Sequence, residues 1–479
     1  MRIALVVDNP CRDLPGLVLL AMHLCQEGVT CYLVPFNLQN NEIWFLNPDF
    51  VLLNYLRRNN ESLAETLAKL GIRFGVLDTE GAPRLEVYVK TLAPTSTLRY
   101  RISCYCCWGA KLAEHLNQEG WYRDEQIMVT GAPRFDFYVH PWREAALRAS
   151  PYAETYPRPI VLIMGNFPLA NPRFTSPEQE GRMMTELFGY NRSDIINWQN
   201  IQRQTLLGMV NLANNLAMRF AQVTFVYRPH PFERLETYLG LLEQRDNLHL
   251  VKMGTVDGWL LRASAVIHRS CFTAVEAGIA GIPAFQPGWI PTSAKLPTSE
   301  AVSIQCETEK ELSQTLESVL TGNFVRPAYI QYRLDEVIHD WFFQIDGRAH
   351  ERVAECILRN LPTEAGRRQL YQWRNSYYGL RLQGKSLRSV TSSALKKLLG
   401  LPNGWSFRRW DVVPASTPWE QSEKFFDAEQ VRALIDAIQV CVRDRSKEPP
   451  RKVGVLSAQE RGDYHSGYLQ GRSVTVFPE

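Results

Sequence analysis

Short apolar runs that predict β-strands alternate with longer stretches that predict helices along most of this chain. The run IALVV at 3–7 is followed by helix-like residues 14–28, and TCYLV at 30–34 comes next. A strand followed by a helix, repeated, is typical of a parallel sheet covered by helices on both faces. Further strands of this first set are predicted at 50–54, 73–77, 100–107 and 126–131.

A second set of the same kind follows a break. Between residues 138 and 159 the periodicity fails and four prolines occur, which predicts a linker. The next strands are predicted at 159–165, 223–228, 248–251, 264–268 and 282–285. Two such sets predict an α/β protein with two Rossmann-like domains that face each other across a cleft, where we expect the active site. The predicted boundaries are 1–140 for the first domain, 141–159 for the linker, 160–360 for the second domain and 361–479 for a basic, helical C-terminal extension.

Composition is that of an ordinary globular protein. The chain has 479 residues, of which 45% are hydrophobic and 22% charged, enough for two or three domains with buried cores. A net charge of +3 is too small to predict nucleic-acid binding. The N-terminus has only IALVV before Asp8, too short for a signal-peptide core, and no apolar run reaches the ~18 residues that span a bilayer. We therefore expect a cytoplasmic protein.

Ten cysteines are scattered through the chain, as expected in a reducing compartment. The densest group is SCYCCW at 103–108. A zinc site would need a second ligand pair at suitable spacing, and the next histidine, His115, stands alone. The group is therefore predicted to be a half-buried strand, and no metal site is predicted.

The stretch YRPHPFE, residues 227–233, begins where a predicted strand ends. Ligands of open α/β sheets bind beyond the carboxyl ends of the strands, and Arg228 and His230 stand at such an end. The prolines on both sides of His230 restrict the backbone and give the loop a fixed direction. This context favours a ligand-binding role for Arg228 and His230 over the alternative, a histidine that caps a backbone group in a tight turn.

A second polar group follows the predicted strand 264–268. Ser270 is predicted to be the N-cap of a helix that extends to Gly278. The start of such a helix, with the hydroxyls of Ser270 and Thr273, suits a phosphate, and Glu276 one turn later suits ribose hydroxyls. The alternative is a well-capped helix with an exposed glutamate. Because His230 belongs to the same half, we expect a nucleotide-sugar site.

The first half has polar residues at comparable places. Asp78, Glu80 and Gly81 follow strand 73–77 in the stretch LDTEGAP, and Arg12 and Asp13 follow strand 3–7. The carboxylates are candidate catalytic groups, and Arg12 can pair with a sugar carboxylate. Asp13 is equally compatible with a helix N-cap before Pro15.

Two further segments, TGAPRFDFY at 130–138 and GNFPLANP at 165–172, also follow predicted strands. Arg134 in the first and Asn166 in the second are candidate contacts to the acceptor or the donor. Either segment is equally compatible with a structural turn that leads into the linker.

These motifs carry a resemblance. The pair His230–Pro231 followed by Ser270 and Thr273 resembles bacterial sialyltransferases and Kdo transferases of the GT-B architecture, which use CMP-activated sugars. Most of residues 1–360 resembles the bacterial surface carbohydrate biosynthesis proteins, a family similar to the retaining β-Kdo transferases of capsule and O-antigen assembly. The motifs that carry this likeness, in order, are VVDNPCRDLPGLVLLAMHLCQEG, LDTEG, TGAPRFD, IMGNFPLANPRF, YRPHPFE and FQIDGRAHERVA. LDTEG departs from the related enzymes, in which two acids precede the glycine.

The resemblance implies a glycosyltransferase that moves a Kdo-like or sialic-acid-like sugar from a CMP-activated donor to a glycan acceptor. The first domain would then be the acceptor side and the second the donor side. Glu80 or Asp78 would be the base or nucleophile, and His230 with Arg228 would act on the leaving phosphate. No cofactor is expected beyond the CMP-sugar substrate, and the absence of an Asp-X-Asp triplet predicts a metal-independent reaction.

Two alternatives stay open at this point. One is a polyol-phosphate transferase that uses CDP-glycerol-like donors. The other is a non-catalytic, transferase-like scaffold, which has less reason to keep His230, Ser270, Glu276 and an acid in the first domain.

The C-terminal extension has its own composition. Residues 361–410 contain ten Lys or Arg and one acid, Glu364, interleaved with Trp and Tyr. Such a segment fits peripheral contact with an anionic membrane surface that carries a lipid-linked acceptor, a docking site for an acidic glycan, or a solvated helical face. Residues 426–442 predict an amphipathic helix that packs back onto the core.

Overall fold

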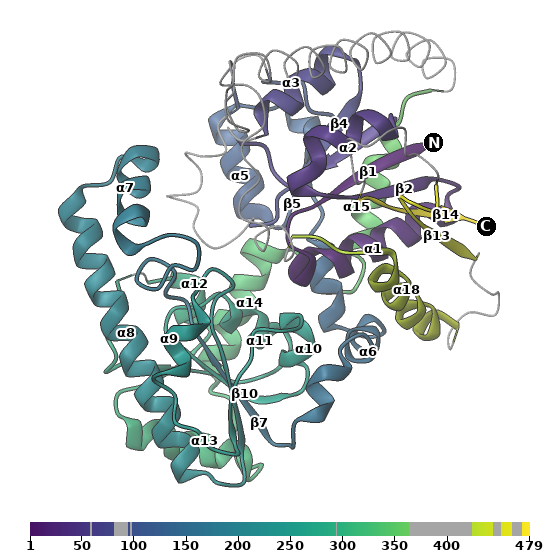
Figure 1. Ribbon diagram of the computed structural model, residues 1–479. Coiled ribbons are helices and arrows are strands. Elements are labelled where there is room, and N and C mark those ends of the chain that lie inside the picture. The colour runs from purple at the N-terminus through teal and green to yellow at the C-terminus, as the bar shows by residue number, and fades with distance from the viewer. Residues whose placement is uncertain are drawn as a thin grey trace, which may run out of the picture.

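A computed structural model of the chain describes residues 1–57, 60–80, 94–95, 98–293, 295–363, 424–443, 452–461 and 472–479. Two sheets with helices on both sides form two lobes (Figure 1). This arrangement confirms the fold class predicted from the sequence, an α/β protein built from two Rossmann-like, GT-B-like domains. Residues 364–423 lie outside the described residues, so the predictions for most of the basic segment 361–410 stay predictions.

The sheet of the first domain contains six parallel strands in the order β2-β1-β3-β4-β5-β6. Its core strands are apolar and buried on both faces, which is why they appear in the sequence as continuous runs. The strands are β1 (Arg2–Val7), β2 (Thr30–Pro35), β3 (Phe50–Leu53), β4 (Arg73–Leu77), β5 (Cys104–Cys107) and β6 (Ile127–Val129). The helices between them are α1 (Pro10–Gln26), α2 (Gln39–Leu46), α3 (Glu61–Lys69) and α5 (Ala110–Glu119).

Strand β5 is more deeply buried than predicted. The group SCYCCW was predicted to form a half-buried strand, yet all four residues of β5 are at most 1% exposed. The reason is tertiary: α15 (Ala349–Arg359), from late in the chain, covers one face of β5, and side chains such as Leu112 and Tyr122 cover the other.

The sheet of the second domain is also parallel, in the order β12-β11-β10-β7-β8-β9. Its strands are β7 (Ile160–Met164), β8 (Thr224–Arg228), β9 (Leu248–Leu250), β10 (Ala263–His268), β11 (Ala284–Pro287) and β12 (Ile304–Cys306). A long helix, α8 (Arg192–Arg219), precedes β8. The other helices are α7 (Pro177–Phe188), α9 (Leu235–Leu239), α10 (Val256–Leu260), α11 (Thr273–Ile279), α12 (Pro297–Ala301), α13 (Glu309–Leu320) and α14 (Ala328–Phe342).

The predicted linker contains regular structure. Residues between the two sheets form the 3₁₀ segment η3 (Pro133–Tyr138), helix α6 (Trp142–Arg148) and the 3₁₀ segment η4 (Pro151–Thr155). Helix α6 packs against η3 and against α18 (Ala428–Arg443) of the first domain. Arg262 of the second domain donates to the carbonyl of Leu147 (2.8 Å) and to Glu154 (2.5 Å), so this part of the chain contacts both domains.

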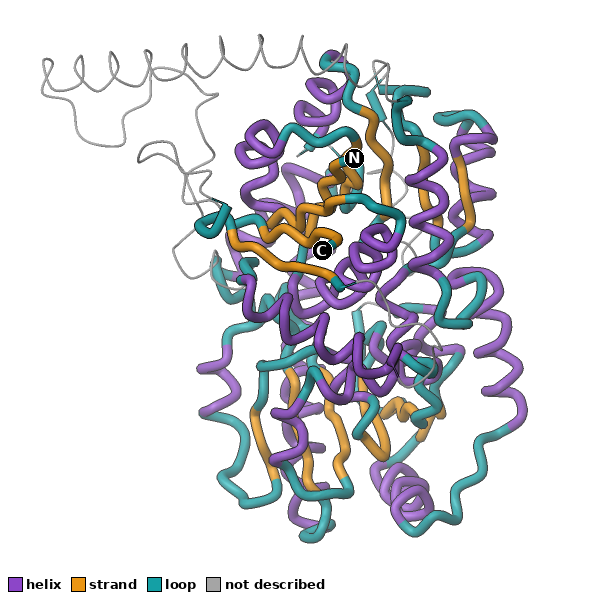
Figure 2. The backbone as a smooth tube through the Cα atoms, turned by 90° about the vertical axis from the view of Figure 1, so that its right-hand side faces the viewer, coloured by secondary structure: helices purple, strands orange, loops and turns teal. Residues whose placement is uncertain are grey.

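The described part of the C-terminal extension adds to the first domain. Helix α18 confirms the amphipathic helix predicted for 426–442 and packs against α1 and α6. Two strands that the sequence pattern did not predict, β13 (Val453–Ser457) and β14 (Val474–Pro478), form an antiparallel pair. Strand β14 pairs antiparallel with β2 and so extends the sheet, which brings the two termini close together (Figure 2).

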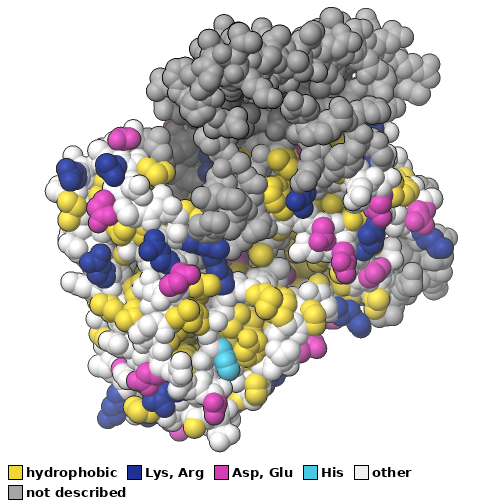
Figure 3. Space-filling view, in the orientation of Figure 1, with side chains coloured by type: hydrophobic (Ala, Val, Ile, Leu, Met, Phe, Trp, Pro, Cys, Tyr) yellow, Lys and Arg dark blue, Asp and Glu magenta, His cyan; other side chains and the backbone are white. Residues whose placement is uncertain are grey.

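The surface carries no large field of one sign on the face drawn in Figure 3, where basic and acidic side chains of the described residues are interspersed. This mixture agrees with the small net charge. Among the described residues, no helix combines the length and the hydropathy that a bilayer crossing requires.

The chain passes from the second domain back to the first through α14 and α15. Helix α14 abuts the start of α5 so closely that a Cβ at Gly109 would lie 2.3 Å from the carbonyl carbon of Trp341. Helix α15 is capped by Asp136 of η3, whose carboxylate accepts hydrogen bonds from the backbone N–H groups of Ala349 (3.0 Å) and His350 (2.9 Å). Nδ1 of His350 lies 2.8 Å from the same carboxylate.

We predict that Asp136→Asn destabilises the protein by roughly 3 kcal/mol, because a buried carboxylate that serves three nitrogens is replaced by a group with its own N–H donors. Glu355→Gln on the same helix is the matched control. Its ion pair with Arg359 is exposed, and we expect a change below about 0.5 kcal/mol. Urea unfolding of both variants checks this, and equal losses would contradict the role given to Asp136.

Candidate active site

Each sheet has one place where its strand order reverses. In the first sheet the chain turns from β1 to β2 on one side and then to β3 on the other, so the switch lies between β1 and β3. In the second sheet it lies between β7 and β10. Ligands of open α/β sheets bind in the crevice outside the carboxyl ends of the strands at such a switch.

A charged cluster occupies the switch of the first sheet. Arg12, in the first turn of α1, donates to Asp8 (2.8 Å) and Asp13 (2.8 Å), and its Nη1 lies 3.7 Å from Glu80. Burial alone would lower the pKa of Arg12, but the carboxylates of Asp13, Asp8 and Glu80 outweigh it and raise the pKa. Arg12 is therefore a fixed cation surrounded by acids.

Asp13 does not cap helix α1. The N-cap is Asn9, whose Oδ1 accepts from the N–H of Cys11 (3.0 Å). Asp13 lies one turn in, where its buried carboxylate accepts from the N–H of Asn9 (3.0 Å) and from Arg12. The structure thus brings Asp13 into the charged cluster as well as into the helix start.

Asp78 and Glu80 differ in environment. Asp78 is fully buried and accepts from the N–H of Glu80 (2.9 Å) and the hydroxyl of Tyr105 (3.2 Å), with Arg57 at 3.5 Å. Burial raises the pKa of Asp78 to about 6, although Arg57 and these hydrogen bonds oppose the rise. The side chain of Glu80 is 49% exposed and lies between Arg12 and Arg57. Gly81 lies outside the described residues.

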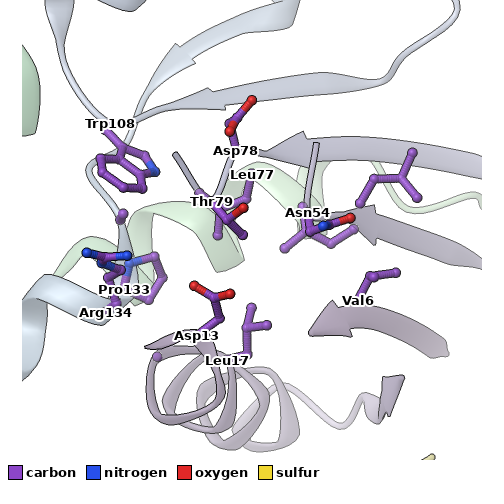
Figure 4. A pocket seen from close by; sticks show the side chains of 14 residues that line it. Val6, Asp13, Leu17, Asn54, Leu77, Asp78, Thr79, Trp108, Pro133 and Arg134 are labelled. Atoms are coloured by element: carbon purple, nitrogen blue, oxygen red, sulfur yellow. The ribbon is translucent and has the colours of Figure 1, made fainter. Parts of the chain in front are cut away.

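The cluster borders a small hollow at the ends of β1, β3 and β4 (Figure 4). Asp13 points into it from α1, with Asn54, Thr79 and Trp108 around it. Its room is about 30 Å³, which holds about one water molecule. Because a nucleotide sugar needs several hundred Å³, the hollow accepts no more than a small group unless the surrounding parts move.

The switch of the second sheet joins Asn166 and Ser270. Asn166, after β7, donates through Nδ2 to the backbone carbonyl of Ser270 (3.3 Å), after β10. Ser270 has a left-handed backbone (φ 55°), which is strained for a residue with a side chain. The prediction that Ser270 is an N-cap is wrong: its hydroxyl donates to Glu300 (2.8 Å), and the residue before helix α11 is Phe272. Thr273 starts the helix and is buried.

The loop that holds His230 is closed by Glu233. The backbone N–H of His230 donates to the buried carboxylate of Glu233 (2.8 Å), and the hydroxyl of Tyr238 donates to the same carboxylate. The half-buried ring of His230 accepts through Nδ1 from the N–H of Phe232 (3.2 Å). This is the backbone-capping contact considered as the alternative, and it leaves the ring proton of the neutral histidine on Nε2.

The side chain of Arg228 binds backbone carbonyl groups. Its guanidinium donates to the carbonyls of Met253 (2.8 Å) and Gly254 (3.0 Å) and stacks over Trp259. Burial lowers its pKa to about 10, so it stays charged at neutral pH.

Glu276 joins the two domains. Both of its oxygens accept from η3, one from the guanidinium of Arg134 and the other from the hydroxyl of Tyr138 (3.0 Å). The side chains of Glu276 and Arg134 are 7% and 14% exposed. Because the carboxylate is buried between these partners, a movement of Arg134 or Tyr138 would open it to a ribose hydroxyl.

The sequence pattern missed several members of these clusters. Asp8, Asn54 and Arg57 follow β1 and β3, so the rule that found Asp78 applies to them too. Asp8 belongs to the motif VVDNPCRDLPGLVLLAMHLCQEG but was not singled out, and no motif was recognised around Asn54 and Arg57. Lys424 of the C-terminal extension lies 3.1 Å from Asp8, a contact across more than 400 residues that no local pattern predicts.

No protein-family profile matches this chain. No curated protein matches it either.

The chain is similar to several solved structures. One is the UDP-GlcNAc 2-epimerase of Methanocaldococcus jannaschii in complex with UDP-GlcNAc and UDP, at 14% identity and a TM-score of 0.47, with 75% of this chain and 100% of that chain covered. Another is S. aureus MnaA with UDP, at 13% identity and 0.46, with 76% and 98% covered. A third is the wall teichoic acid polymerase TagF, at 12% identity and 0.49, with 75% and 88% covered. Similarity at this level does not transfer a function to the chain.

We predict that Asp78 makes the protein less stable as the pH rises. Its pKa is raised from 3.8 to about 6 in the folded state, so the folded state holds this proton more tightly than the unfolded state does. The stabilisation is present at low pH and is lost as the pH rises through about 6. The free energy of unfolding should fall by roughly 2 kcal/mol more in the wild type than in Asp78→Asn between about pH 4.5 and about pH 7.

Urea unfolding at the two pH values measures this difference. Asp340→Asn, which removes an exposed carboxylate, is the control and should follow the wild type. A wild type and an Asp78→Asn variant with the same pH dependence would show that Asp78 is not the group described.

Proposed function

We propose that the protein is a glycosyltransferase of bacterial surface polysaccharide biosynthesis, which transfers a Kdo-like or sialic-acid-like sugar from CMP to a glycan acceptor. The observation that carries this proposal is the pairing of two half-sites. Carboxylates that form ion pairs with arginine lie at the switch point of the first sheet. The loops with Asn166, His230 and Ser270 lie at the carboxyl ends of the strands of the second sheet.

In this proposal Glu80 is the carboxylate that acts on the acceptor hydroxyl or the anomeric carbon. Its side chain is exposed enough to reach a substrate, whereas Asp78 is buried and accepts the N–H of Glu80. Asp78 is then a positioning residue. Arg12 and Arg57 hold Glu80 and provide positive charge next to a sugar that carries its own carboxylate.

His230 acts on the leaving CMP phosphate. With Nδ1 accepting from the backbone, the neutral ring keeps its proton on Nε2, the atom that can donate to a departing phosphate oxygen. A monophosphate leaving group can be stabilised by such donors, so the proposed reaction needs no metal. Arg228 supports the loop geometry and contributes charge at a distance.

Donor binding is coupled to a shift at the domain boundary. Glu276 is the proposed ribose contact, and it becomes available when Arg134 or Tyr138 moves away. The small volume of the hollow agrees with a site that opens to accept the donor. The acceptor glycan, lipid-linked or free, then approaches from the first domain, and the basic segment 361–410 is proposed to bring the protein to the inner face of the membrane.

A thermal-shift series with CMP, CDP, UDP and GDP tests the donor class, because a ligand that binds only the folded state raises the melting temperature. CMP should give the largest shift. Incubation with CMP-Kdo, a CMP-sialic-type sugar or CDP-glycerol then separates the sugar transferase from a polyol-phosphate transferase, since each releases CMP from its own donor only. A larger shift with UDP than with CMP would contradict the cytidine assignment.

We predict that Glu80→Gln lowers turnover by roughly 10²–10⁴-fold while the CMP-induced shift stays, because the carboxylate acts on the reacting groups and does not contact the nucleotide. Glu243→Gln, an exposed acid far along the chain that pairs with Arg245, is the control and should keep full activity. The measurement is CMP release under saturating donor. Full activity of Glu80→Gln would move the catalytic role to another carboxylate.

A further inference from the structure

Three buried thiols meet where α15 crosses β5. Cys104 and Cys106 are two residues apart on the strand, so their side chains share the face that α15 covers, and Cys356 comes from α15 itself. The three sulfur atoms lie within 4.8 Å of one another, and each residue is at most 3% exposed. Within the described part of the chain, no other group of three or more Cys, His, Asp or Glu side chains brings its ligand atoms this close together.

The neighbouring strand leaves room for these sulfurs. Gly75 of β4 is paired with Cys104, and a Cβ at position 75 would lie 2.6 Å from Cys104 Sγ. A glycine in the middle of a buried strand weakens it and often marks a close approach. Position 75, between Phe74 and Val76, therefore has no side chain at the place where the sulfur of Cys104 approaches the strand.

The spacing of the sulfurs suits a shared ion. Metal–sulfur bonds of about 2.3 Å put three thiolates around one ion roughly 4 Å from each other, so each sulfur would move by less than about 1 Å.

We propose that Cys104, Cys106 and Cys356 bind one soft, thiophilic cation. Thiolates select Cu⁺ and Zn²⁺ among cellular metals. Structural zinc almost always has four ligands, and the described residues supply three, so Cu⁺ is the better fit and Zn²⁺ the second. Loading forms three metal–sulfur bonds and releases the thiol protons to solvent.

The consequence is a cross-link between distant parts of the chain. Helix α15 is the segment that returns from the second domain, and the ion fastens it to the sheet of the first. Because the thiols are buried, the ion enters during folding. This inference is independent of the proposed function, since its readout is bound metal and not activity.

The full-length protein is expressed in separate cultures supplemented with copper or zinc, purified anaerobically with a phosphine reductant, and measured for metal content and melting temperature. Cys356→Ala and Cys104→Ala remove ligands. Cys107→Ala is the matched control, because Cys107 is equally buried on the same strand but faces the opposite side. We expect about one ion per chain in the wild type and the control, and none in the ligand variants.

Removal of the ion with a competing thiol chelator should lower the melting temperature of the wild type and leave Cys356→Ala unchanged. About one equivalent of metal in the wild type from either culture supports the site, and the culture or cultures that give it identify the ion. Two results overturn it: wild type from both cultures without bound metal, or ligand variants that hold as much metal as Cys107→Ala. If Cys356→Ala does not fold, Cys104→Ala alone decides between these outcomes.

Discussion

A buried carboxylate links the two domains directly. Glu276 of the second domain accepts from Arg134 and Tyr138 of the first, and a charge in this setting is costly unless both oxygens are served. The contact is fixed from the other side as well, because α1 packs so closely on η3 that a Cβ at Gly16 would lie 2.6 Å from the backbone nitrogen of Arg134. Helix α1 carries Asp13, so this chain of contacts sets where the charged cluster stands relative to the second sheet.

Much of the fold could be predicted because each buried parallel strand appears in the sequence as a short, continuous apolar run. Runs such as IALVV at 3–7 and PIVLIMG at 159–165 are apolar throughout, which is what burial on both faces requires. The same rule located polar residues just after the strands, including Asp78 and His230, and the structure brings Arg12, Asp13, Asp78 and Glu80 into one cluster.

The structural features that the sequence did not predict depend on contacts between distant segments of the chain. Glu276 was predicted to face a ribose, yet its partners in the first domain lie 142 and 138 residues away. Strand β14 forms at the edge of β2 from the far end of the chain, and a short isolated strand has no periodicity strong enough to reveal this pairing. The burial of the cysteines on β5 has the same origin, because α15 is supplied by residues more than 240 positions later.

We propose that the carboxyl ends of the two sheets form a single donor site, closed by the contact at Glu276. Hydrogen–deuterium exchange with and without CMP tests it most directly. We expect slower exchange in the loops after β7, β8 and β10, at residues 165–172, 229–234 and 269–273, together with a change in η3 as Arg134 and Tyr138 shift. Unchanged exchange in all of these segments at saturating CMP, or protection confined to other parts of the chain, would contradict it.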